Sequence, residues 1–404
     1  MIVAETIQPT PVAGRIIDVR HVIPYMHPAA GGPPVVVDRL CRVLPDHGYR
    51  CHVASTDMFA RTVDRAWLQQ FQGSYPVTIC KSRGPGTYSY SRELFAQLDG
   101  LVAKSHLVHL HTVWTYPTWA AMRVCRRHRV PYIVMPHGML DPHSLERKWT
   151  KKQLYGRLIE WPNLRRANGM VYTHQAEQEL AEASVSGLPT GFIVPLGTDD
   201  PPQASREILA DEFLSANPVL RDKDLIVFLS RLHSKKGLDL LIPAFARVAA
   251  RHPRAHLVLV GPGDPSYIAS LQHLAAQQGV AARCNFTGPL EGRAKWTALA
   301  AATVFALPSY QENFALVVVE AQRMGVPVLI SRRVNIWQDI VTAGGGVVAE
   351  LSIGGVTDSL ESLFADRSSA SIMGRRGQQF VSAHYRWDLS AQALSRVYQQ
   401  VLGI

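Results

Sequence analysis

Short apolar runs alternate with longer segments of helical character along the whole chain. The runs in the first half are RIIDVRHVIP, CHVAST, LVHLHT, YIVMPHG, MVYTH and FIVPLG, and those in the second half are LIVFLSR, AHLVLVGPG, NFTGPL, TVFALPS and VPVLIS. Strands that are apolar on both faces and alternate with helices are typical of parallel sheets covered on both sides. The pattern therefore predicts an α/β chain with doubly wound sheets.

The chain is long enough for two domains. Its 404 residues exceed what one hydrophobic core usually supports. The alternation is interrupted at VPLGTDDPPQAS, residues 194–205, where paired prolines follow a glycine and two aspartates. We therefore expect a first domain at 1–198, a second at 206–382 and a helical closing segment at 383–404. Ligands of open α/β sheets bind beyond the carboxyl ends of the strands, so the residues after each strand are the site candidates.

The charge balance favours anionic partners. A net charge of +10 suits binding to nucleotides, a membrane surface or nucleic acid. No helix-turn-helix, zinc-finger or aromatic-platform motif is visible, so we expect no nucleic-acid partner. No apolar run approaches the ~20 residues of a membrane span, and the opening MIVAETIQPTPVAGRIIDVR is unlike a signal peptide. We therefore expect a cytoplasmic protein.

The cysteines do not form a recognisable framework. The five are scattered and never spaced as Cys-x-x-Cys: Cys41, Cys51, Cys80, Cys125 and Cys284. This spacing argues against both a disulfide scaffold and a structural zinc site. We expect inert core thiols and no metal.

The stretch FLSRLHSKKGLDLL carries a candidate anion site. A strand predicted at 225–230 is followed by Arg231, Lys235 and Lys236, and a helix then begins near Gly237. Guanidinium, ammonium and the free N–H groups of a helix N-terminus all favour phosphate. The alternative is a solvated basic loop.

Two weaker motifs lie nearby. In LVLVGPGDP, Gly261 and Gly263 let the backbone approach a ligand after a strand, although the third glycine of the dinucleotide fingerprint is missing and a plain tight turn explains them equally well. The DKD at 222–224 resembles a metal-binding pair, but it precedes its strand. A capped turn is the better interpretation there.

The stretch SYQENFALVVVEAQRMGVPVLIS brackets an apolar run with Glu312 and Glu320. Residues 314–324 fit a helix closed by Gly325, which places Glu312 at its entrance and Glu320 about two turns in. Charged groups are rarely buried unless paired, so each carboxylate needs a partner or a ligand. Free N–H groups at residues 313–316 suit phosphate or sugar oxygens.

These residues carry a resemblance to a known family. SYQENFALVVVEAQRMGVPVLIS resembles the Glu-x7-Glu signature of retaining glycosyltransferase family 4, and SRLHSKKGLDLL resembles its Arg and Lys-Gly segment. MPHGMLDPHSLERKWTKKQLYGRLIE, with LVHLHTVW before it, is similar to members that build bacterial exopolysaccharides and lipopolysaccharides. The resemblance spans nearly the whole chain. It implies the GT-B fold, two Rossmann-like doubly wound domains facing a central cleft.

The resemblance implies a donor site for a UDP- or GDP-activated hexose in the second domain. Arg231 and Lys236 would hold the diphosphate, with Gly261 nearby, and Glu320 would bind the ribose. Glu312 would bind the sugar hydroxyls, helped by the backbone of its followers: Asn313, Phe314, Ala315 and Leu316. Family members usually have glycine where this chain has Ala315.

In the first domain, the resemblance implies that His137 lies beside the transferring sugar. Gly31 and Gly32 would open the first helix against the phosphates. Pro33 and Pro34 follow them, and proline offers no N–H, so the phosphate contact is weaker there. The closing segment 383–404 would cross back to this first, acceptor-side domain.

The implied mechanism is transfer with retention, without a metal or another cofactor. Arg231, Lys236 and helix termini would stabilise the leaving diphosphate, whose distal phosphate can take the acceptor's proton. No carboxylate is placed as a nucleophile, so we expect no covalent intermediate. The catalytic set is expected to be His137, Glu312, Arg231 and Lys236.

The acceptor is expected to be a lipid-linked sugar. His111 and Trp114, at the end of a strand, would line its site, whereas packing explains His109 better. Residues 144–166 combine basic with apolar side chains at roughly helical spacing, which is typical of a membrane-surface helix. A packed helix with a solvated basic face is the alternative. The membrane version predicts a peripheral protein on the cytoplasmic face of the inner membrane.

Two rival functions stay open. Another two-domain nucleotide-sugar enzyme, such as a non-hydrolysing epimerase, would not release diphosphate in an acceptor-dependent way. A non-catalytic nucleotide-sugar-binding protein would bind the donor without turnover.

Overall fold

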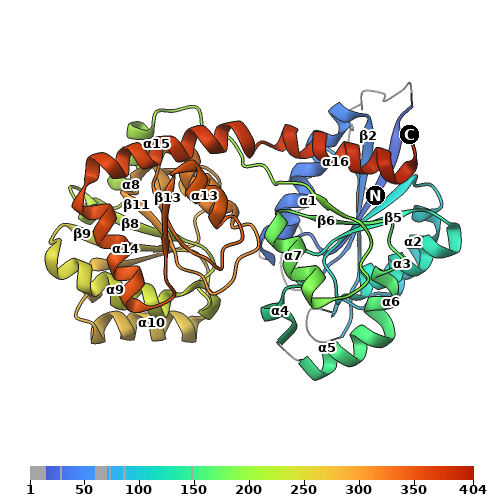
Figure 1. The fold of residues 1–404 in the computed structure, drawn as a ribbon, viewed down its shortest axis with the longest axis horizontal. Helices are drawn as coiled ribbons and strands as arrows, with labels where there is room; N and C mark the ends of the chain where they lie inside the picture. The colour runs from blue at the N-terminus through green and yellow to red at the C-terminus, as the bar shows by residue number, and fades with distance from the viewer. Residues whose placement is uncertain (1–14, 28–29, 60–70, 72–73, 85–87, 147–148) are drawn as a thin grey trace. The chain divides into compact units, whose positions relative to one another are not determined.

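The computed structural model describes residues 15–27, 30–59, 71, 74–84, 88–146 and 149–404 (Figure 1). The chain divides into two compact units, one of residues Met1–Gly197 with Trp387–Ile404 and the other of Thr198–Arg386. Each unit contains one sheet whose strands pair only in parallel. The predicted fold of two Rossmann-like α/β domains is confirmed.

The sheet of the first unit has the strand order β3-β2-β1-β4-β5-β6-β7. Its strands are β1 (Ile17–Tyr25), β2 (Tyr49–Thr56), β3 (Val77–Cys80), β4 (Leu107–His111), β5 (Tyr132–Met135), β6 (Gly169–Tyr172) and β7 (Gly191–Ile193). Val19 of β1 pairs with Cys51 of β2 on one side and Leu107 of β4 on the other. The order reverses between β1 and β4, and ligands of doubly wound sheets bind at such a reversal, beyond the carboxyl ends of the strands.

The helices of the first unit cover its sheet (Figure 1). They are α1 (Gly32–Val43), η2 (Leu44–His47), α2 (Arg92–Val102), α3 (Tyr116–His128), α4 (Pro142–Glu146), α5 (Trp149–Tyr155), the π-helical η5 (Gly156–Glu160), α6 (Trp161–Leu164), α7 (Gln175–Ser184) and the terminal α16 (Trp387–Leu402). Core residues such as Val22, Leu110 and Val134 come from the strands and are fully buried.

Helix α16 belongs to the core of the first unit. The Tyr49 hydroxyl donates to the Ser395 carbonyl over 3.1 Å, and the Tyr398 hydroxyl lies 2.8 Å from His109 Nδ1. Ser390 Oγ donates to the Pro195 carbonyl over 2.7 Å. Tyr398 itself is fully buried. The C-terminal segment is thus held by polar contacts as well as by burial.

The sheet of the second unit has the strand order β10-β9-β8-β11-β12-β13. Its strands are β8 (Asp224–Leu229), β9 (Ala255–Val260), β10 (Cys284–Gly288), β11 (Val304–Leu307), β12 (Val328–Ser331) and β13 (Gly346–Ala349). Here the order reverses between β8 and β11. The carboxyl ends of these two strands therefore mark the expected ligand position in this unit.

The second unit also has helices on its sheet (Figure 1). They are α8 (Arg206–Ala216), η6 (Pro218–Leu220), η7 (Ser234–Lys236), α9 (Leu238–Arg251), α10 (Pro265–Gln277), η8 (Ala281–Arg283), α11 (Gly292–Ala301), α12 (Leu316–Arg323), α13 (Trp337–Ala343), α14 (Ile353–Ala365) and α15 (Arg367–His384). The amphipathic α9 buries Leu241, Phe245 and Val248.

The prediction of one regular amphipathic helix at 144–166 is wrong. The segment is broken into α4, α5, a π-helical turn and α6, and residues 147–148 lie outside the described residues. Trp161 is packed in the core, whereas Leu154 and Leu158 are 65% and 71% exposed. A Cβ at Gly156 would lie 2.6 Å from the Trp161 ring, so the glycine at the start of the π-turn lets Trp161 pack closely.

Candidate active site

The loops after β8 and β11 meet at the reversal of strand order in the second unit. Arg231 follows β8 with an exposed side chain, and the short helix η7 then ends at Lys236. The Tyr310 N–H, just after β11, donates to the Lys235 carbonyl over 2.8 Å. The two loops are therefore tied together through their backbones.

Lys236 and Glu312 form an ion pair across these loops. Their side chains are only 15% and 14% exposed. The Glu312 carboxylate also accepts from Ser309 Oγ over 3.3 Å, and its backbone N–H donates to the Arg333 carbonyl over 2.9 Å. The structure thus brings together a cation and a carboxylate that the sequence placed far apart. An ammonium has three donors, so Lys236 can bind a phosphate and keep Glu312.

Helix α12 begins at Leu316, two residues later than predicted. Ala315 is its N-cap and has φ 56° and ψ 61°, a left-handed conformation that disfavours a side chain. Phe314 is buried edge-on against Tyr385, and the side-chain oxygen of Asn313 accepts from Asn335 over 3.3 Å. The segment before α12 is thus held from both sides. The Val318 N–H donates to the carbonyl of the N-cap Ala315 over 2.8 Å, whereas the N–H groups before it lie where an α-helix offers no carbonyl partner.

Ala315→Gly is expected to stabilise the second unit by about 0.5 to 1 kcal/mol. The left-handed conformation costs a non-glycine residue roughly 1–2 kcal/mol, of which the greater freedom of glycine in the unfolded chain cancels a part. Urea unfolding measures the change. Ala321→Gly, inside the same helix, is the control and should destabilise. Equal destabilisation by both substitutions would contradict this explanation.

Glu320 lies within α12 and is paired with Lys295 of α11. Lys295 Nζ lies 2.6 Å from the carboxylate, and the two side chains are 20% and 13% exposed. Sequence reasoning missed Lys295, because nothing in its own segment marks it. Its ammonium fixes the orientation of the Glu320 carboxylate.

Gly261 lies where the loops after β8, β9 and β10 converge. Its φ is 141°, and a Cβ there would lie 2.0 Å from the Ser230 carbonyl oxygen. Its own N–H donates to the Gly288 carbonyl over 2.9 Å. Any side chain at Gly261 would therefore push the loop that carries Arg231 away from β9.

In the first unit, α1 begins at Gly32 with Gly31 as its N-cap, as predicted. Gly31 has φ 98°, a conformation that glycine adopts readily. Pro33 and Pro34 occupy the first turn. They contribute no N–H, so Gly31 and Gly32 are the residues of this turn that keep a backbone donor.

His137 follows β5 and is linked to His111 at the end of β4. His111 Nδ1 lies 3.1 Å from His137 Nε2, and His111 Nε2 lies 3.0 Å from His21 Nδ1. Burial lowers the pKa of the His137 imidazole to about 3. His137 is therefore neutral at neutral pH and available as an uncharged donor or acceptor.

The predicted contact of His111 with the acceptor needs a correction. His111 is fully buried, and its two ring nitrogens face His21 and His137. We therefore place it behind His137, as a residue that orients the His137 ring. Thr112, Trp114 and His137 have φ of 70°, 68° and 53°, so left-handed backbone gathers at these strand ends. Strained backbone of this kind clusters at functional sites.

Trp114 is held by a carboxyl group that sequence reasoning missed. Its backbone N–H donates to Glu160 Oε1 over 3.1 Å, and its indole N–H donates to the Met139 carbonyl over 3.3 Å. Glu160 is buried, and Oε2 has no hydrogen-bond partner among the described residues. Burial raises the pKa of Glu160 from 4.5 to about 7.

The stability of the first unit is expected to fall as pH rises from about 4.5 to about 7. In this window the folded state holds a proton on Glu160 that the unfolded state releases. At about 1.4 kcal/mol for each pH unit, the loss amounts to about 3 kcal/mol and levels off above pH 7. Urea unfolding of the wild type and Glu160→Gln across this range isolates the effect. A stability difference independent of pH would contradict it.

Comparisons with known proteins agree with this architecture. The family described as "Glycosyl transferase 4-like domain" matches residues 31–197, and "Glycosyl transferases group 1" matches residues 211–380. Together these matches cover the greater part of both units. The chain belongs to the GT-B glycosyltransferases.

A curated relative supports the same family. The chain is 32% identical over 221 residues to a GDP-mannose-dependent alpha-(1-6)-phosphatidylinositol monomannoside mannosyltransferase of Mycobacterium tuberculosis. The match covers 53% of this chain and 55% of that protein, so the chain spans about half the length of this relative.

Two solved structures show the fold of this GT-B chain. A glycosyltransferase from Rickettsia africae has a TM-score of 0.75 at 14% identity, covering 96% of this chain and 99% of that one. HepE from Anabaena, in complex with UDP and glucose, has a TM-score of 0.72 at 18% identity, with coverages of 95% and 99%. At these identities the likeness concerns the fold alone.

Proposed function

We propose that this GT-B chain moves a hexose from a nucleotide-sugar donor to a sugar acceptor, with retention and without a metal in the transfer step. The observation that carries the proposal is the Lys236–Glu312 ion pair at the reversal of strand order, with an exposed Arg231 in the same segment between β8 and α9 as Lys236. Cations for a diphosphate and a carboxylate for sugar hydroxyls are what a nucleotide-sugar requires at one place.

The proposed step breaks the bond between the sugar's anomeric carbon and the distal phosphate oxygen and forms one to the acceptor oxygen. Arg231, Lys236 and the backbone N–H groups from Asn313 to Leu316 stabilise the negative charge of the leaving diphosphate. The distal phosphate takes the acceptor's proton, so the acceptor can attack from the face that the diphosphate leaves. Neutral His137 donates a hydrogen bond to the transferred sugar.

The proposed donor site also gives roles to Glu320 and Gly261, the other predicted site residues of the second unit. Glu320, oriented by Lys295, binds the ribose hydroxyls, and Gly261 keeps the Arg231 loop close to the phosphates. GDP-mannose is the first donor to test, because the M. tuberculosis relative is named for it. UDP-hexoses are the second.

Turnover assays with a donor panel test the proposal. We expect release of nucleoside diphosphate that requires an acceptor sugar and survives brief treatment with EDTA. Proton NMR of the product should show the anomeric configuration of the donor. An epimerase would instead interconvert the donor sugar without an acceptor, and a binding protein would give no product. Inverted product would contradict the proposed geometry of attack.

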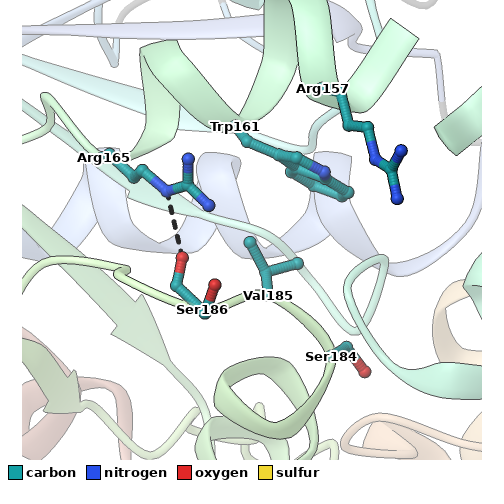
Figure 2. A pocket seen from close by; sticks show the side chains of 6 residues that line it. All are labelled: Arg157, Trp161, Arg165, Ser184, Val185 and Ser186. Carbon is teal, nitrogen blue, oxygen red and sulfur yellow. Dashed lines mark hydrogen bonds between the residues drawn. The ribbon is translucent and has the colours of Figure 1, made fainter. Parts of the chain in front are cut away.

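We further propose that the acceptor is lipid-linked and that the enzyme acts in surface-polysaccharide synthesis. The first unit would then contact an anionic membrane surface, the cytoplasmic face of the inner membrane. Figure 2 shows Arg157 and Arg165 on either side of Trp161, in a pocket of about 240 Å³ that Ser184, Val185 and Ser186 complete. The exposed Leu154 and Leu158 lie on either side of Arg157 in the sequence. Exposed leucines beside arginines suit the interface of an anionic bilayer. Among the described residues, no helix is long and apolar enough to cross a membrane.

Vesicle flotation tests the membrane contact. Binding to vesicles of phosphatidylcholine and phosphatidylglycerol should fall roughly tenfold when Leu154 and Leu158 are both changed to glutamate. The change removes two leucines that would be buried in the bilayer and adds two negative charges that an anionic surface repels. Ile208→Glu, at an exposed aliphatic residue of the second unit, is the control. Equal binding by all three proteins would contradict the contact.

A further inference from the structure

A buried cluster of histidines and cysteines lies in the core of the first unit, apart from the residues used above for donor binding. β1, α1 and β2 bring together His21, Cys41 and Cys51, which are 0%, 0% and 2% exposed. One ligating atom of each lies within 4.8 Å of those of the other two. This cluster could not be predicted from the sequence, because Cys41 and Cys51 come from a helix and a strand and have no Cys-x-x-Cys spacing.

Two imidazole nitrogens at this cluster have no hydrogen-bond partner among the described residues. They are His21 Nε2 and His109 Nε2. The other nitrogen of each ring is engaged, since His21 Nδ1 lies 3.0 Å from His111 Nε2 and His109 Nδ1 lies 2.8 Å from the Tyr398 hydroxyl. A buried polar atom without a partner costs free energy comparable to a lost hydrogen bond.

This pattern is the one that metal-ligating histidines show. Such a histidine binds the metal through one nitrogen while the other N–H donates to a neighbouring group, which fixes the tautomer. His21 and His109 both have their Nδ1 atoms occupied in this way. The unpartnered His21 Nε2 is therefore the imidazole atom positioned to bind an ion together with the two thiols.

We propose that His21, Cys41 and Cys51 bind a structural zinc ion in the core of the first unit. The ligating atoms of His109 and His21 belong to a second set, with His111, that also lies within 4.8 Å. Nitrogen and sulfur ligands are the set that Zn²⁺ prefers in closed tetrahedral sites.

The charges of this site are compatible with full burial. Binding releases one proton from each thiol, and two thiolates then neutralise the doubly charged ion. The ion would join β1, β2 and α1, whose first turn follows the N-cap Gly31. It lies outside the transfer step, so the inference goes beyond the proposed function and does not require it.

Metal analysis of the purified full chain tests the inference. Protein prepared without chelators or affinity metals should contain about one zinc per chain, and Cys51→Ala should lose at least ~90% of it. The control is Cys125→Ala, which removes another fully buried thiol of the same unit and should retain the zinc. Lys236→Ala should also retain it, which separates this site from the donor site.

A second measurement covers the case in which Cys51→Ala does not fold. Wild-type protein refolded with Co²⁺ alone should show the thiolate-to-cobalt charge-transfer band and the intense visible bands of a tetrahedral ion. Protein that binds neither zinc nor cobalt would overturn the inference. A disulfide between Cys41 and Cys51 in untreated protein, or equal zinc in Cys51→Ala and Cys125→Ala, would also overturn it.

Discussion

Lys236→Ala is expected to lower kcat roughly 10²- to 10³-fold, the usual cost of removing one group that stabilises charge in a transition state. The proposed step develops negative charge on the leaving diphosphate, and Lys236 is the largely buried cation at the reversal of strand order. Because the charge grows as the bond breaks, the loss should appear mainly in kcat and less in KM. Steady-state kinetics with the preferred donor measures both.

The control for this prediction lies before the strand that the Lys236 segment follows. Lys223 immediately precedes β8 and is exposed, at the opposite end from Lys236, so Lys223→Ala removes the same charge without touching the site. It should leave kcat unchanged. Thermal unfolding should show that Lys236→Ala still folds, although Glu312 has lost its partner. Unchanged turnover in Lys236→Ala would contradict the proposal that Lys236 stabilises the leaving diphosphate.

Gly261→Ala is expected to destabilise the second unit by roughly 2–4 kcal/mol and to abolish measurable donor binding. The added Cβ would lie 2.0 Å from the Ser230 carbonyl oxygen, a backbone atom that cannot turn aside. The β8 loop must therefore shift, which moves Arg231 and adds strain at a φ of 141°. Urea unfolding and calorimetric titration with nucleoside diphosphate measure the two effects.

A second glycine separates collision from backbone conformation. Gly279 also has a positive φ, 72°, but a Cβ there would meet no atom within 4 Å. Gly279→Ala should therefore cost only about 1 kcal/mol and leave donor binding intact. If Gly261→Ala behaved like Gly279→Ala, the close packing of the loops after β8 and β9 would not matter for the site.

The sequence predicted the elements that alternation reveals. The parallel strands, the N-terminus of α1 at Gly31 and Gly32, and the helix after Glu312 were all readable, because apolar runs and glycine breaks mark them directly. The start of α12 was predicted two residues early. Alanine does not favour the left-handed conformation, so the sequence did not indicate that Ala315 adopts it as the N-cap.

Features that depend on contacts between distant segments were not predictable. Lys295 and Glu160 act through partners on other elements, and no local pattern marks either residue. The segment 144–166 has helical spacing, yet the packing of Trp161 against Gly156 bends it through a π-turn. Likewise, His21 meets Cys51 because β1 pairs with β2, and Cys41 joins them from α1.

The most direct test of the donor site is calorimetric binding of GDP and UDP in metal-free buffer. We predict that the wild-type chain binds one of the two with clear preference and that Glu320→Ala weakens this binding at least ~10-fold, the loss of a charge-assisted hydrogen bond to ribose. Glu212→Ala, at an exposed glutamate of α8, should bind like the wild type. Binding of neither nucleotide would leave the GT-B fold standing and contradict the proposed donor site.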